Sequence, residues 1–315
     1  MEGPGGALEL ARFAIGTGVL AWAALSDLRT RRVADRAWWL LLAAGAVILE
    51  LELASAGEGP AHLLTPLYIV VFFLSLWFEG EVLGEGFRRR DSAVLAAGLN
   101  LAALMVVAAQ LSTGPLDPST EAGFRHLQLL TIPVMMLLAY VLYRTQLLTG
   151  GADAKAFLAL SVLVPFYPAP LLELVPVPRG FTLLCPFVLA VFFTAAFLTL
   201  LNPVALLIYN LARGDRGRLM AIAYRVPIDE ARRKRFIWLS ECVEGGKRRH
   251  LYFRFRGQSA RWKREQLRLL EEMGETRVWV QPQIPFMVQL LAGFVLCSLL
   301  GNFILYGIIK MAAGV

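Results

Sequence analysis

Charged residues are scarce in this sequence. Asp, Glu, Lys and Arg make up only 17% of the 315 residues, whereas 57% are hydrophobic, and the mean hydropathy is +0.59. A soluble globular domain is about one quarter charged. The composition therefore excludes an ordinary soluble protein and indicates a membrane protein.

Residues that bind metals or form disulfides are also few. The three cysteines, Cys185, Cys242 and Cys297, lie far apart and form no CxxC pair, and the three histidines do not cluster. These spacings argue against a zinc site or a disulfide framework. We expect the protein to work without a cofactor.

Long apolar segments, in contrast, are abundant. A membrane-spanning helix needs roughly 20 predominantly apolar residues, and eight segments approach that length. They lie at Leu8–Ser26, Ala37–Leu53, His62–Leu83, Ser92–Ser112, Phe124–Leu148, Ala154–Tyr167, Phe181–Tyr209 and Ile284–Ile309. No basic residue precedes the first segment, so it is not typical of a signal peptide. The predicted fold class is an all-α polytopic membrane protein with about eight transmembrane helices and a small α+β cytosolic domain.

Basic residues are distributed unevenly between the loops that join these segments. All but four of the 31 lysines and arginines fall on one predicted face, which the positive-inside rule assigns to the cytoplasm. The exceptions are Arg12, Arg125, Arg179 and Lys310. We therefore expect a multi-pass protein of the cell membrane with both termini outside the cytoplasm. The net charge of +7 reflects this topology and attraction to anionic lipid headgroups rather than binding to nucleic acid.

One long polar stretch interrupts the apolar pattern, and it predicts three parts. Residues 1–210 would form a transmembrane catalytic domain, residues 211–282 a cytosolic α+β domain, and residues 283–315 a C-terminal transmembrane helix. Within the polar part, the segments RFIWLSECV, HLYFRFR and RVWV are typical of strands, EGGKRR of a hairpin, and SARWKREQLRLLEEMG of a helix.

Ionisable residues inside a bilayer are costly and are functional candidates by default. Glu50, Glu52, Glu79 and Glu81 fall at predicted helix ends, where the side chains can reach water. Two aspartates remain. Asp27 closes the first helix in SDLRTRRV, and Asp153 opens the sixth helix in TGGADAKAF, so both fall at the cytoplasmic edge.

Each aspartate also has a purely structural interpretation. Asp27 could pair with Arg29 or Arg31, and Asp153 could serve as a helix N-cap. Together they suggest acid–base chemistry, because two neighbouring carboxylates cannot both ionise easily. The charged member can take a proton from water while the protonated member polarises a peptide carbonyl. Gly150 and Gly151 would let a peptide backbone approach closely.

These motifs carry a family resemblance. The sequence resembles the GxGD class of intramembrane aspartyl proteases in three features, which are GGAD followed by AK, the early SDLRTRRV and the polytopic setting. Within that class it most resembles the archaeal prepilin and preflagellin (prearchaellin) peptidases. The C-terminal segments RFIWLSECVEGGKRR and RVWVQPQIPFMVQLLAGF resemble one archaeal subgroup of that family. The resemblance implies that Asp27 and Asp153 are the catalytic pair and that Gly150, Gly151 and Ala152 shape the active-site loop.

The sequence departs from relatives in several ways. Ala152 replaces the glycine that usually precedes the second aspartate, a change that the archaeal group accepts. Four predicted helices, rather than two, separate the aspartates, and the cysteine-based zinc module of bacterial relatives is missing. The presenilin and signal-peptide-peptidase branch ranks second, because Ser26 precedes Asp27 and PAPLL lies on the wrong side of the motif.

The resemblance further implies substrates, which are pilin-like or archaellin precursors with a basic segment before an apolar helix. Lys155 would tune Asp153 or contact lipid headgroups, and Glu241 and Glu244 would be solvated surface or attract the basic segment. Two functions of other classes stay open: a cation- or proton-coupled transporter that uses the two aspartates, and a non-catalytic scaffold for pilus assembly. The sequence leaves the oligomeric state open.

Overall fold

The computed structural model describes residues 4–56, 65, 69, 71, 89–145, 147–148, 150–172, 174–252 and 258–314. The chain divides into two compact units, Met1–Ala196 together with Phe286–Val315, and Phe197–Pro285. Each unit has its own hydrophobic core. The second unit starts before residue 211, and the three-part division drawn from the sequence stays a prediction.

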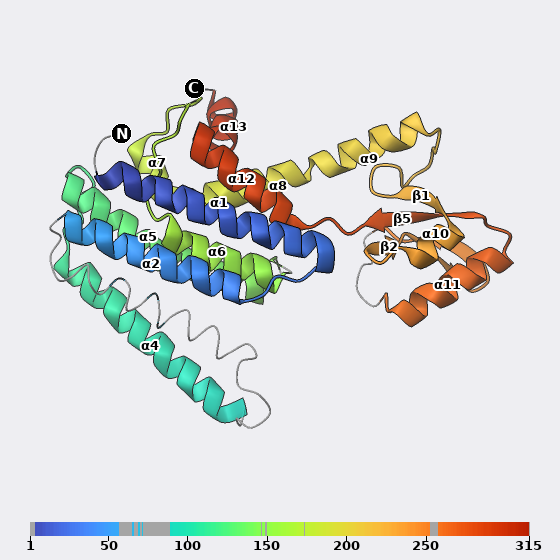
Figure 1. Cartoon of the computed structure of the whole chain (residues 1–315), viewed down its shortest axis with the longest axis horizontal. Coiled ribbons are helices and arrows are strands. Elements are labelled where there is room, and N and C mark those ends of the chain that lie inside the picture. Colours follow the sequence, from blue (N-terminus) through green and yellow to red (C-terminus); the bar gives the residue numbers. More distant parts are fainter. Residues whose placement is uncertain are drawn as a thin grey trace. The chain divides into compact units, whose positions relative to one another are not determined.

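Helices make up the first unit (Figure 1). They are α1 (Pro4–Thr30), α2 (Arg36–Ser55), α4 (Arg89–Thr113), α5 (Glu121–Arg144), α6 (Gly151–Leu163), α7 (Arg179–Leu184), α8 (Phe187–Thr199), α12 (Phe286–Leu300) and α13 (Phe303–Ala313). The third apolar segment, His62–Leu83, lies outside the described residues apart from three positions, and so do Glu79 and Glu81.

Several helices are long and apolar enough to cross a bilayer. Among the described residues these are Gly6–Thr30, Arg36–Ser55, Glu121–Arg144 and Phe187–Ala212, and a fifth span exists if the bent pair α12 and α13 counts as one. The protein is therefore a mostly helical membrane protein. The eight spans expected from the sequence are not confirmed.

Proline and glycine explain why two expected spans are broken or shortened. Helix α6 ends at Leu163, not at Tyr167, because Val164 precedes Pro165 and the residue before a proline disfavours helical angles. Helices α12 and α13 are bent by 74° at Gly301, whose φ of +73° is typical of a helix stop. The segment Phe181–Tyr209 is divided among α7, α8 and α9 (Leu201–Ala212).

Helix α6 is the central element of the first unit. All residues from Ala156 to Leu163 are buried, and the helix packs against α1, α2 and α5 (Figure 1). Its Phe157 ring lies 4.5 Å from that of Phe192 in α8. A helix that is apolar on every side belongs in the interior of a bundle. At 13 residues it is about 20 Å long, shorter than a bilayer core of about 30 Å.

Glycines allow the surrounding helices to approach closely. A Cβ atom on Gly45 of α2 would lie 2.7 Å from the Leu163 Cα atom of α6, and a Cβ on Gly293 of α12 would lie 2.8 Å from the Val191 carbonyl oxygen of α8. Small residues at such crossings are the usual basis of helix packing in membranes, where lipid is as apolar as the side chains. The bundle thus depends on backbone contacts at these positions.

The second unit is a small α+β fold, in agreement with the composition of its sequence. It contains α9, β1 (Tyr224–Pro227), α10 (Ile228–Arg233), β2 (Ile237–Leu239), β3 (Glu241–Glu244), β4 (Lys247–His250), α11 (Ala260–Glu272) and β5 (Arg277–Pro282). Strand β5 is central in an antiparallel sheet of order β1-β5-β2, and β3 and β4 form a hairpin. Along β5, Val278 and Val280 join the core shared with α11, whereas Trp279 packs against Leu219 and Ala223.

The sequence located the hairpin correctly and one strand incorrectly. Gly245 and Gly246 form the two-residue turn with φ of +59° and +71°, the combination that a type I′ turn requires. The strand expected at His250–Arg256 is wrong in its placement, because β4 ends at His250 and pairs through Lys247 to His250 with β3. Residues 253–257 lie outside the described residues.

Glu241 is fully buried, so its interpretation as solvated surface is wrong. Its carboxylate accepts hydrogen bonds from the Arg248 guanidinium, and its second oxygen accepts one from the Trp279 backbone N–H at 3.3 Å. Glu244 is exposed and lies 3.4 Å from Arg249. Glu241 therefore ties the hairpin to β5 and is not available to a basic peptide.

We expect Gly45→Ala to destabilise the bundle by about 1–3 kcal/mol, because the new methyl group would meet backbone atoms that cannot rotate away. Gly18→Ala in α1 is the matched control, since its Cβ would meet nothing within 4 Å and alanine favours a helix. Thermal unfolding of both variants in detergent measures the difference. Equal melting temperatures for the two variants would contradict the close contact.

Candidate functional site

Asp27 lies in the last turn of α1, and the residues that follow it form a tightly bonded loop. The Ser26 hydroxyl donates to the Arg32 carbonyl oxygen at 2.7 Å, and the Thr30 hydroxyl lies within hydrogen-bond distance of the same oxygen and of the Ser26 carbonyl. Arg31 adopts a φ of +57°, which stops the helix and reverses the chain. The polar residues of SDLRTRRV thus fix where Asp27 sits.

Two groups that favour a negative charge face Asp27. The backbone N–H of Met287, in the first turn of α12, faces the carboxylate, and the Arg31 guanidinium interacts with it electrostatically. Exposed N–H groups at a helix N-terminus attract anions. Of the two arginines proposed as partners from the sequence, Arg31 is the one that the structure places in this role.

Asp153 lies in the first turn of α6, but it is not the N-cap. The N-cap is Gly150, and the N–H of Asp153 donates to the Gly150 carbonyl oxygen at 3.1 Å. The Asp153 carboxylate folds back over Gly150, where a Cβ atom would lie 2.3 Å from Oδ2 and 2.9 Å from Cγ. Only glycine fits beneath the carboxylate in this position.

The structure brings the two aspartates together. Their carboxyl groups lie close enough for their charges to interact, although Asp27 and Asp153 are separated by more than 120 residues of sequence. Both side chains are partly buried at the same end of the bundle, where α1 ends and α6 begins. Helix counting predicts that both aspartates share one membrane edge, and the structure has both at one end of the bundle.

The remaining residues of the predicted loop differ in their surroundings. Gly151 is exposed, and its Cβ would lie 3.9 Å from the Tyr143 hydroxyl, an ordinary contact. Ala152 packs partly against the main core. The Lys155 ammonium forms an ion pair of 2.7 Å with Asp35, the N-cap of α2, so it links α6 to the start of that helix. Its proposed influence on Asp153 stays a prediction.

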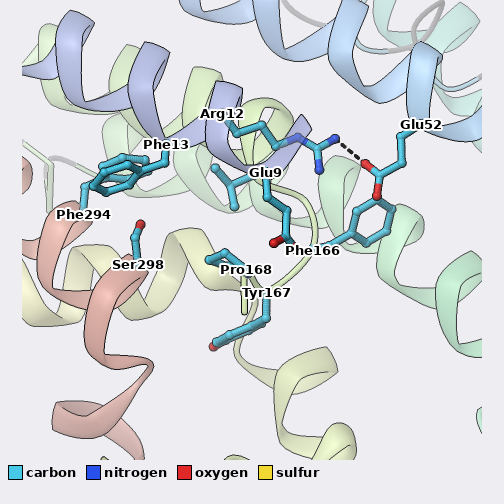
Figure 2. Close-up of a pocket in the computed structure, with 10 residues that line it drawn as sticks. Glu9, Arg12, Phe13, Glu52, Phe166, Tyr167, Pro168, Phe294 and Ser298 are labelled. Carbon is cyan, nitrogen blue, oxygen red and sulfur yellow. Dashed lines mark ion pairs between the residues drawn. The ribbon is translucent and has the colours of Figure 1, made fainter. Parts of the chain in front are cut away.

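A second polar cluster lies at the opposite end of α1 (Figure 2). Arg12 is buried, with 4% of its surface exposed. It forms an ion pair of 2.7 Å with Glu52 of α2, and its guanidinium lies over the Phe166 ring. The expectation that Glu52 merely reaches water at a helix end is therefore wrong. Fifteen helical residues separate Arg12 from Asp27, about 22 Å.

This second cluster is too small to hold a peptide. The pocket beside Arg12 and Glu52 has a volume of about 30 Å³, the share of about one water molecule. Nearby, the Tyr167 hydroxyl donates to the Cys185 carbonyl oxygen at 2.6 Å and accepts from the Asn302 amide at 3.1 Å, which ties the chain after α6 to α13. These contacts hold the bundle together and leave the aspartate pair as the candidate site.

Sequence reasoning missed the contacts that depend on distant segments. Nothing in the sequence pairs Met287 with Asp27, Arg12 with Glu52, or Lys155 with Asp35, because each contact depends on which helices are neighbours. A hint existed for Met287, since a helix start is a general anion site. Among the described residues, no group of three or more His, Cys, Asp or Glu side chains is arranged to hold a metal ion.

Comparison with known families gave one match. Residues 216–303 match the family model described as Archaeal Peptidase A24 C-terminus Type II, which covers the second unit from the segment before β1 and continues through α12. Comparison with curated proteins gave no significant match. The family match supports the archaeal prepilin and preflagellin peptidases, independently of the aspartate motifs, which lie outside the matched residues.

Proposed function

Because residues 216–303 match the family model of the archaeal A24 peptidase C-terminus, we propose that the chain is a membrane-embedded aspartyl endopeptidase. Its substrates would be type IV pilin-like or archaellin precursors, cut at the cytoplasmic edge of the membrane. The observation that carries the proposal is the pairing of Asp27 and Asp153 at one end of an apolar bundle. Partly buried carboxyl groups that act on each other's protonation are typical of active sites.

The surroundings of the two carboxylates support different roles. Burial disfavours the charged form of both carboxylates, and at Asp27 the charge of Arg31 and the Met287 N–H offset part of that cost. At Asp153 the charge of Asp27 adds to the effect of burial, and both favour the protonated form. We assign Asp27 as the general base and Asp153 as the general acid in the resting enzyme.

The reaction then needs water and the two side chains. Asp27 takes a proton from a water molecule, whose oxygen attacks the scissile carbonyl carbon, while Asp153 gives its proton to the carbonyl oxygen. The tetrahedral intermediate collapses when the C–N bond breaks, and the proton held by Asp27 passes to the leaving amine. The hydroxyl proton of the intermediate returns to Asp153, so both carboxyl groups recover their starting states.

The substrate preference follows from the expected topology. The uneven distribution of basic residues supports a cytoplasmic position for the α1–α2 loop and both aspartates. A precursor with a basic segment followed by an apolar helix would place the junction of the two at this depth, with its helix in the bilayer. Both termini of the protease would lie outside the cytoplasm.

A transporter is supported less well. Transport sites usually lie near the bilayer midplane at broken helices. The break between α12 and α13 is at Gly301, whereas Asp27 lies near Met287 at the other end of α12, about 20 Å away along the helix. The aspartates are therefore remote from the feature that a transporter would use.

Asp27→Asn and Asp153→Asn should each reduce cleavage of a pilin-type precursor by at least about a hundredfold, the usual contribution of a general acid or base. Asp117→Asn, in an exposed loop, is the matched control and should keep full activity. The measurement is the rate at which purified protein converts precursor to mature product in detergent or vesicles. Full cleavage by either site variant would remove the aspartyl mechanism.

Gly150→Ala should abolish most activity, because its methyl group would occupy the space of the Asp153 carboxylate and displace it from Asp27. Gly151→Ala should retain activity, since its methyl group makes only an ordinary contact. The two variants differ by one position and carry the same substitution, so the ratio of their cleavage rates isolates the steric effect. Comparable cleavage rates for the two variants would show that activity does not depend on the position of the Asp153 carboxylate above Gly150.

A further inference from the structure

A basic pocket lies in the second unit, away from the aspartates in sequence and in no way required for the reaction. It has a volume of about 300 Å³. Among the residues that the structure describes, no Asp or Glu lines this pocket. Six cationic side chains do, and these are Arg232, Arg233, Lys234, Arg235, Lys263 and Arg264. Cationic groups collected in a hollow repel one another, so such a lining calls for an anion.

The counter-charges of this unit do not neutralise the pocket. Arg232 pairs with Asp229 and Glu271, and Lys234 pairs with Glu230. The other four form no ion pair with any residue that the structure describes, and these are Arg233, Arg235, Lys263 and Arg264. Four positive charges that line the pocket are therefore not neutralised by an ion pair.

Lys263 shows the electrostatic cost most clearly. Its ammonium donates a hydrogen bond to the Lys234 carbonyl oxygen at 2.8 Å, which holds it in place without a carboxylate. Burial lowers the pKa of this lysine, because the charged form loses hydration. An anion bound beside it would restore the lost stabilisation of the charge.

A helix N-terminus opens onto the same pocket. Helix α11 is capped by Ser259, whose hydroxyl accepts from the Trp262 N–H at 3.1 Å, and its first residue, Ala260, lines the pocket. The helix has 13 residues, so its dipole adds to the charges of the arginines and lysines. Helix N-termini with basic side chains bind phosphate groups in many folds.

We propose that this pocket binds a phosphate-bearing anion, supplied either by an acidic lipid headgroup or by a soluble phosphate compound. Its volume is at the lower end of small-ligand pockets, about 300–1,000 Å³, and suits a headgroup-sized molecule. The lining residue Gln283 is followed, after Ile284 and Pro285, by the apolar helix α12, so the sequence tethers this edge of the pocket to a membrane segment. The basic segment of a precursor has the wrong sign for the site.

The test uses the full chain in neutral detergent and two probes, a short-chain phosphatidylglycerol and inorganic pyrophosphate, with short-chain phosphatidylcholine as the uncharged comparison. The pocket variant is Arg235→Gln with Arg264→Gln, two exposed side chains whose loss leaves the core intact. The matched control is Arg261→Gln with Arg268→Gln, which removes the same charge from helix α11 outside the pocket lining. Calorimetry measures the dissociation constant of each probe.

We expect the pocket variant to weaken binding of the anionic probe by about thirtyfold, since each basic residue near a lipid surface contributes about a factor of five. The control should weaken it by about threefold or less. Binding of phosphatidylglycerol alone would support the headgroup as the source, and binding of pyrophosphate, alone or in addition, would support the phosphate group itself.

The proposal would be overturned if neither anionic probe binds, if phosphatidylcholine binds as tightly, or if both double variants lose affinity equally. Tighter binding of a single-stranded RNA than of either probe would also overturn it. Arg233→Gln, a further exposed lining residue, provides a second variant if the first pair alters folding. Precursor cleavage should continue in every variant, so failure here is separable from failure of the proposed protease activity.

Discussion

The first unit depends on one constraint, which is that two carboxyl groups that would repel each other if both were ionised lie at the same end of an apolar bundle. Two neighbouring carboxylates repel each other when both are ionised, so such a pair tends to hold one proton. A fold that merely had to cross a membrane would separate them. Here the end of α1 and the start of α6 meet, and the Met287 N–H and Arg31 stabilise the charge on one member. These contacts offset part of the free energy lost by burying the charge, and they act on Asp27 and not on Asp153.

The position of Asp153 depends on the short central helix that carries it. Helix α6 is buried from Ala156 to Leu163, whereas Gly151 in its first turn is exposed, so that turn is within reach of water. Backbone contacts at Gly45 hold α6 against α2, and Lys155 with Asp35 holds its first turn. A rigid helix thus presents the carboxylate, and Gly150 leaves room for it.

Sequence reasoning proposed Asp27 and Asp153 as the candidate site because helix counting needs only an even number of crossings between them to place both on one face. It located the hairpin at Gly245 and helix α11 because their local signals are strong. It missed β1, a four-residue strand that ends in Pro227, and it joined α12 to α13 across Gly301. Local propensity does not report which distant helices are neighbours, so the contacts of Asp27, Arg12 and Lys155 needed the fold.

The central claim is that Asp27 and Asp153 are neighbours in the folded protein. The direct measurement replaces the native Cys185, Cys242 and Cys297 with serine, introduces Asp27→Cys together with Asp153→Cys, and follows cross-linking by a short thiol-reactive linker in membranes. The account predicts rapid cross-linking of this pair and none when Asp27→Cys is combined with Ser161→Cys, eight residues along α6 and about 12 Å farther from the site. Absence of the 27–153 cross-link in folded protein, or equal cross-linking of both pairs, would contradict it.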